Sequence, residues 1–184
     1  MASSLEKLVA SHGVTVQWHS FELRPKDAPP LPPEYKEKIM AGRPRLYAIA
    51  RENYGLELNQ GPFGINSRPA LIGAKYAEAQ GVGPAYHDAV MRAYWLEAQS
   101  IEDRDVLAAI AVAAGLVRED FLAALNDTSR EQEVLNDIAW AHTNGINGVP
   151  ALVFQGKYLV SGAQPYEVLT KVVDQIQAEE QKAG

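Results

Sequence analysis

The chain has 184 residues, of which 47% are hydrophobic and 22% are charged, and its formal net charge is −6. This composition excludes wholesale disorder, and the scattered Lys and Arg residues exclude a general nucleic-acid binder. The absence of cysteine excludes disulfides, thiolate nucleophiles and iron–sulfur clusters within these residues. No apolar run approaches the roughly 20 residues that cross a bilayer, so we expect a soluble, cytoplasmic protein without a membrane partner.

The first 33 residues predict a helix, a strand and a linker. Residues 3–12 have the spacing of a short amphipathic helix, which Gly13 ends. Residues 14–23 begin with alternating apolar and polar side chains, which is typical of a strand. Five prolines between residues 24 and 33 indicate an extended linker and a domain boundary.

The next segment, from residue 34 to about residue 126, predicts helices only. Two helices, 34–40 and 45–54, are expected to be separated by a break near Gly42 and Pro44, because both residue types interrupt helices. A loop follows over residues 55–66. We expect four more helices, at residues 68–80, 84–98, 103–114 and 118–125.

The last third of the chain changes character. Thr128 and Glu131 fit a capping box at the start of a long helix that runs to about residue 144. Two short strands, 149–154 and 158–160, flank a tight turn and predict an antiparallel hairpin. Pro165 begins a C-terminal helix. Its expected buried side consists of Val168, Leu169, Val172, Val173 and Ile176.

This order of elements resembles a thioredoxin fold with a helical insertion, as in the DsbA superfamily. Five short motifs make the chain similar to the DsbA/FrnE-like group of bacterial thiol–disulfide oxidoreductases. They are the Trp18-x-x-Phe21-x-Leu23-x-Pro25 stretch, Asn66–Ala70, Asp105–Leu107 with Ala114–Leu116, Gly148–Ala151 and Ser161–Pro165. The resemblance covers essentially the whole chain.

The resemblance implies an α/β fold: a thioredoxin-like sheet with a large all-helical insertion. Residues 1–24 and 128–184 would form a discontinuous thioredoxin-like domain, and residues 25–127 the insertion. The first strand and the C-x-x-C motif of the family would lie upstream of Met1, so we expect this chain to lack them. The family exchanges thiols and disulfides on protein or peptide substrates. Without a thiolate we expect the chain itself to be redox-inactive, which leaves open whether it is an enzyme.

The strongest candidate site is the loop formed by Gly148, Val149 and Pro150. In the family this proline is cis, and the backbone before it pairs with an extended peptide substrate. The resemblance therefore implies a cis Val149–Pro150 bond and substrate binding by these three residues. From spacing alone, an ordinary trans proline at the start of an edge strand would be the expectation.

Other candidate residues favour structural roles. The histidines are His12, His19, His87 and His142, and none is spaced with a second ligand on one face, so we expect no metal site and no cofactor. Glu22 is expected at a solvated strand end. Ser3 and Ser4 have no adjacent base to activate them as nucleophiles.

Two alternative functions stay open. One is a non-catalytic module that binds extended peptides, and the other is a glutathione-dependent isomerase of the kappa-transferase or hydroxychromene-carboxylate type, which shares the architecture. A sheet without its first strand exposes interior edges, because buried N–H and C=O groups need partners. We expect these edges to close either by pairing of residues 14–23 with the hairpin or through a homodimer.

Overall fold

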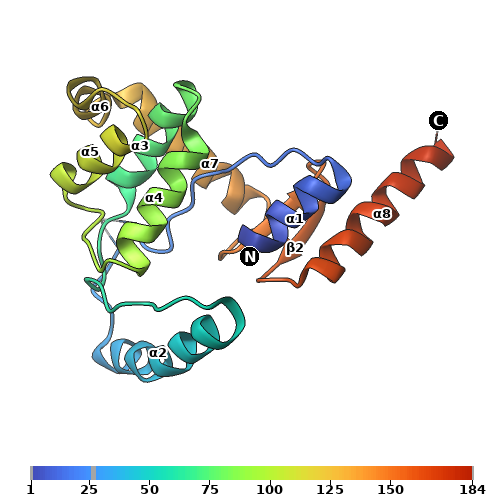
Figure 1. The fold of residues 1–184 in the computed structure, drawn as a ribbon, viewed down its shortest axis with the longest axis horizontal. Helices are drawn as coiled ribbons and strands as arrows, with labels where there is room; N and C mark the ends of the chain where they lie inside the picture. Colours follow the sequence, from blue (N-terminus) through green and yellow to red (C-terminus); the bar gives the residue numbers. More distant parts are fainter. Residues whose placement is uncertain (1, 26–27, 184) are drawn as a thin grey trace. The chain divides into compact units, whose positions relative to one another are not determined.

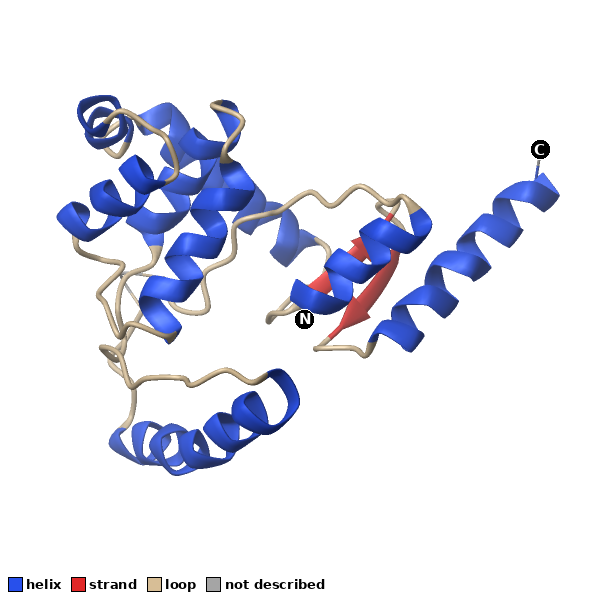
Figure 2. Cartoon of the chain, in the orientation of Figure 1, coloured by secondary structure: helices blue, strands red, loops and turns tan. Residues whose placement is uncertain are grey.

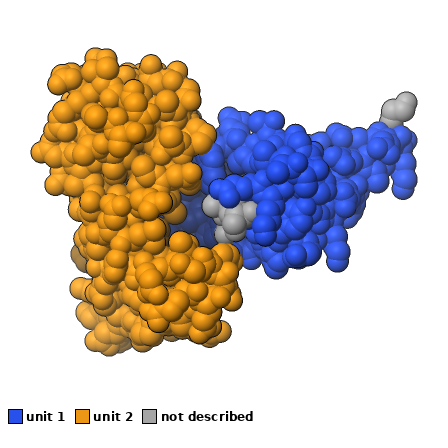
Figure 3. Space-filling model, viewed as in Figure 1, with its two compact units in different colours: residues 1–23, 137–184 blue, residues 24–136 orange. Residues whose placement is uncertain are grey.

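The computed structural model describes residues 2–25 and 28–183, which form two compact units (Figure 3). Unit 1 combines residues 1–23 with residues 137–184, and unit 2 consists of residues 24–136. The secondary structure of the described residues is mainly helical, with one two-stranded antiparallel sheet (Figure 2). Both strands belong to unit 1.

Unit 1 is a hairpin packed against two helices (Figure 1). The strands β1 (Ala151–Phe154) and β2 (Tyr158–Ser161) pair antiparallel, with Ala151 opposite Ser161. The helices are α1 (Ala2–His12) and α8 (Tyr166–Ala183). Their buried side chains form one cluster against which the strands pack: Leu5, Leu8, Leu169 and Val173, with Leu152, Phe154 and Val160. This cluster supplies the packing that an isolated hairpin lacks.

The expected strand over residues 14–23 is wrong. Within the described residues β1 pairs with β2 alone, and the segment after α1 makes no backbone ladder with either strand. The segment keeps part of the predicted alternation, since Val14 and Val16 are half-buried, but Trp18 is 42% exposed. An extended chain becomes a strand only when a neighbour accepts and donates its hydrogen bonds. The direct pairing of this segment with the hairpin is therefore wrong as well.

A carboxylate on α7 (Thr128–Thr143) holds this segment in place of a ladder. Asp137 accepts a hydrogen bond from the backbone N–H of Ser20 at 2.7 Å, and its other oxygen lies 2.8 Å from Nδ1 of His19. The His19 ring also stacks on Trp140, with 5.5 Å between the ring centroids. Because Ser20 is 5% exposed, its N–H depends on this acceptor rather than on water.

Unit 2 is helical. It contains α2 (Pro33–Tyr54), α3 (Arg68–Ala79), α4 (Gly83–Trp95), α5 (Arg104–Ala113), α6 (Arg118–Ala124) and the first part of α7. Tyr86, Leu107 and Phe121 are fully buried in its core. Gly73 on α3 admits these rings, because a Cβ there would lie 2.7 Å from the Phe121 ring. Burial raises the pKa of Tyr86.

Three local expectations differ from the structure. The helix α2 is continuous through Gly42 and Pro44, since both residues are exposed and water can satisfy the carbonyl that proline leaves unpaired. The start of α7 is capped by Asp127 rather than by a Thr128 capping box. The Asp127 carboxylate accepts hydrogen bonds from Ser129 Oγ and its N–H, each at 2.8 Å, which lowers the pKa of Asp127.

The third difference lies on α8, where Val168 is 39% exposed although we expected it on the buried side. Leu169, Val173 and Ile176 are buried as expected. The buried stripe of α8 is therefore narrower than the apolar pattern suggested. Among the described helices, none is long and apolar enough to span a membrane.

We predict that Asp137→Ala lowers the free energy of unfolding by about 2 kcal/mol, because a buried N–H loses its acceptor and His19 loses its partner. Urea denaturation followed by circular dichroism measures this change. The control is Asp174→Ala, which removes a second His–Asp pair, 3.4 Å from His12 to a carboxylate that is 65% exposed. That change should cost less than about 0.5 kcal/mol. Equal losses in the two variants would contradict the role given to Asp137.

Candidate functional site

A helix ending in a Schellman motif shapes the predicted loop. After α7, the N–H of Gly145 bonds to the carbonyl of His142 at 3.0 Å, and the N–H of Ile146 bonds to that of Ala141 at 2.9 Å. Gly145 has φ of 71°, a left-handed conformation that glycine adopts without steric cost. Ile146 is 7% exposed and anchors the chain just after the turn. The loop therefore leaves α7 in a fixed direction.

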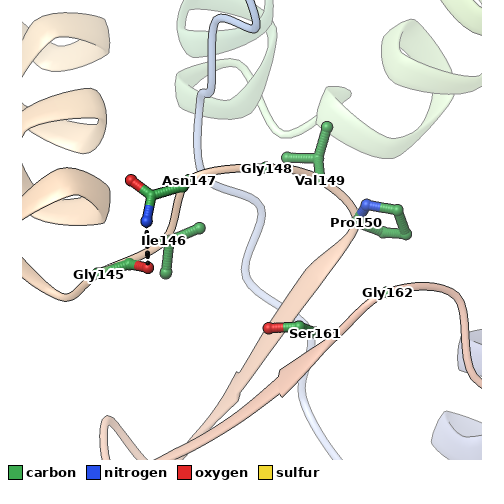
Figure 4. Close-up of a pocket in the computed structure, with 8 residues that line it drawn as sticks. All are labelled: Gly145, Ile146, Asn147, Gly148, Val149, Pro150, Ser161 and Gly162. Atoms are coloured by element: carbon green, nitrogen blue, oxygen red, sulfur yellow. Dashed lines mark hydrogen bonds between the residues drawn. The ribbon is translucent and has the colours of Figure 1, made fainter.

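The same loop forms one wall of a shallow cavity of about 380 Å³ (Figure 4). The cavity is lined by Gly145, Ile146, Asn147, Gly148, Val149, Pro150, Ser161 and Gly162. Figure 4 shows the Asn147 side chain turned back to the carbonyl of Gly145, where its Nδ2 donates a hydrogen bond of 3.1 Å. All three predicted site residues thus line one cavity, together with the end of β2.

The backbone around Pro150 is fixed on one side and open on the other. The Val149–Pro150 peptide bond is cis, and the carbonyl of Pro150 accepts a hydrogen bond of 2.8 Å from the N–H of Gly162. Within the described residues, the N–H and C=O of Val149 have no hydrogen-bond partner. The Val149 side chain is 51% exposed. An extended peptide could therefore bond to Val149 as an added strand does.

The cavity is lined by few groups that could carry out a reaction. Its side-chain polar groups are those of Ser161 and Asn147, and the chain contains no cysteine to act as a thiolate. Within the described residues, no three His, Asp or Glu side chains converge on a metal-sized site. Of the two serines considered as nucleophiles, the side chain of Ser3 lies outside the described part of the chain. Ser4 is half-buried in α1.

Of the remaining predicted candidates, His87 lies on α4 in unit 2 and the others lie in unit 1. His12 is the last residue of α1, and His142 is exposed near the end of α7. Glu22 is 4% exposed, so the expectation of a solvated carboxylate is wrong. The pairing of His19 with Asp137 was missed, because 118 positions separate the two residues and no local spacing connects them.

The fold and this loop define a class of protein. A β–β–α unit with a proline loop before its first strand, preceded by a helix and interrupted by an all-helical insertion, is a thioredoxin-like fold of the DsbA type. A family model for the DSBA-like thioredoxin domain matches residues 1–174. The chain therefore belongs to the DSBA-like thioredoxin domain family, as the resemblance implied.

Similar proteins agree with this assignment. The chain is 32% identical to a chain described as a "probable DsbA oxidoreductase" from Streptomyces coelicolor, with a TM-score of 0.82 over 97% of this chain and 83% of that one. It is 27% identical to the uncharacterised protein YwbO of Bacillus subtilis, over 93% of this chain and 86% of that protein. A 2-hydroxychromene-2-carboxylate isomerase shares the fold at 24% identity, with a TM-score of 0.76 over 98% of this chain and 90% of its own.

We predict that Gly145→Ala destabilises the chain by about 1–2 kcal/mol, because a Cβ is strained at its positive φ. Gly148→Ala is the matched control in the same loop. A Cβ at Gly148 meets no atom within 4 Å, and its φ is not in the left-handed region. Thermal unfolding of the two variants measures the difference, and a Gly148→Ala variant as unstable as Gly145→Ala would contradict the Schellman description.

Proposed function

We propose that this chain binds extended segments of protein or peptide thiol substrates at Gly148, Val149 and Pro150, without exchanging their disulfides itself. One observation carries the proposal: the backbone of exposed Val149, which lines the cavity, has no hydrogen-bond partner among the residues that the structure describes. A peptide that pairs with this N–H and C=O would lie alongside the backbone that leads into β1, as an added strand lies beside its neighbour. Main-chain pairing of this kind gives affinity with little demand on sequence.

Family membership supports the substrate class. DsbA-like proteins act on protein thiols in general, and the backbone groups of Val149, which have no partner within the described residues, would suit a polypeptide. Exchange itself needs a thiolate that attacks a disulfide sulfur, and no residue among these 184 can supply one. The proposal therefore separates the binding step, for which the loop is suited, from the chemical step.

We predict that the chain binds a fluorescein-labelled decapeptide of alternating serine and valine, with lysine at each end, in fluorescence anisotropy. Val149→Pro removes the N–H donor and should weaken this binding by about two- to tenfold relative to Val149→Ala, which keeps the donor. Circular dichroism confirms that both variants fold. No binding by the wild type, or equal binding by the two variants, would exclude strand-like pairing at Val149.

Two further measurements on the same protein distinguish the alternative activities. We predict no catalysis of insulin reduction by dithiothreitol beyond that of a heat-unfolded sample, because the chain lacks a thiol. Isothermal titration calorimetry with reduced glutathione should show no heat of binding. Saturable glutathione binding that Val149→Pro leaves intact would instead favour a glutathione-dependent isomerase.

A further inference from the structure

The helix α2 carries an exposed apolar seam with heptad spacing. The residues along this seam are spaced alternately four and three positions apart, which is the a/d pattern of a coiled coil. We call this set the α2 seam: Tyr35, Ile39, Gly42, Leu46, Ile49 and Asn53. Tyr35 is 54% exposed, Leu46 44% and Ile49 40%, so large apolar groups lie in solvent along the helix. Exposed apolar side chains arranged in this way indicate a contact surface.

A neighbouring face of α2 already packs within its own unit. The Nζ of Lys36 and the guanidinium of Arg43 lie over the Phe63 ring, 5.7 Å and 5.6 Å from its centroid. Ala50 continues this face of α2 beyond Arg43 and is buried. The helix therefore uses one side for the loop that contains Phe63 and leaves the α2 seam for another partner. Phe63 also holds two of the cations that would otherwise flank the seam.

We propose that the α2 seam binds the α2 seam of a second copy of this chain, in antiparallel orientation. An antiparallel pair with its twofold axis near residue 44 places Leu46 of each copy opposite Gly42 of the other. A Cβ at Gly42 meets nothing within 4 Å, so the space beside it is free to receive a leucine. A parallel pair would place Gly42 against Gly42 and leave a gap, which costs packing energy.

Charge complementarity favours the same alignment. The flanking positions beside the seam that Phe63 does not occupy carry Lys38, Arg45 and Glu52. In the antiparallel pair, Lys38 of each copy faces Glu52 of the other, which gives two ion pairs related by the twofold axis. Arg45 faces its own equivalent at the axis, which is one like-charge contact against two attractive ones. The seam is thus complementary to itself.

This surface differs from the sheet edge on which the sequence-based expectation of a homodimer depended. The α2 seam lies in unit 2, whereas the peptide-binding loop at Val149 lies in unit 1. The peptide binding and the dimerisation can therefore be tested independently. A Val149→Pro variant that no longer binds the decapeptide should still dimerise through α2.

Analytical ultracentrifugation tests the association. At a chain concentration of about 100 µM, which suits a contact of micromolar affinity, we expect a species of twice the 20.1 kDa chain mass. Leu46→Asp should reduce this species to the monomer, while Val112→Asp, at a 49% exposed position on α5, should leave it unchanged. A wild-type monomer at this concentration would overturn the proposal, and so would monomers from both variants.

A charge swap tests the antiparallel alignment. Lys38→Glu replaces two attractive contacts with two repulsive ones and should weaken dimerisation by about five- to thirtyfold. Adding Glu52→Lys to the same chain should restore it, whereas Lys171→Glu, at an exposed position on α8, should have no effect. Weakening that Glu52→Lys does not recover would overturn this alignment. A monomeric wild type that floats with phosphatidylglycerol vesicles would also contradict the proposed dimer, since the α2 seam would then bind a membrane instead of a second copy.

Discussion

The need of every buried backbone N–H and C=O for a partner governs unit 1. The two strands bond to each other along their shared edge, and one face of the hairpin packs on the apolar cluster from α1 and α8. The extended segment after α1 has no strand to pair with among the described residues, so one carboxylate, that of Asp137, takes over part of this role. Within the described part of the chain, the N–H and C=O of exposed Val149 are the exception, since neither has a hydrogen-bond partner.

The loop before Pro150 owes its shape to the way in which α7 ends. A glycine in left-handed conformation reverses the chain, and a buried isoleucine fixes the exit, so that the following residues reach Pro150 in a defined position. The hairpin register then brings Ser161 and Gly162 to the opposite wall of the cavity. This DsbA-like chain therefore keeps the cis-proline loop beside the hairpin while it contains no cysteine.

Local interactions made much of this structure predictable. The helices of the insertion, the hairpin and the C-terminal helix follow from apolar periodicity and from turn residues, since their hydrogen bonds join positions three or four apart or across a tight turn. The loop at Gly148, Val149 and Pro150 was found through resemblance rather than spacing. Ser161 and Gly162 were named only as part of a motif, although the predicted hairpin already implied that they lie beside Pro150.

The sequence by itself determined the type of most elements, the DsbA-like order in which they follow one another, and the absence of a thiol. Only the tertiary structure decided the fate of residues 14–23, the burial of Glu22 and the pairing of His19 with Asp137. It also decided that α2 continues through Pro44. The physical reason is that a strand, a buried carboxylate or a helix that continues through proline depends on partners distant in sequence or on water. Local sequence patterns record neither.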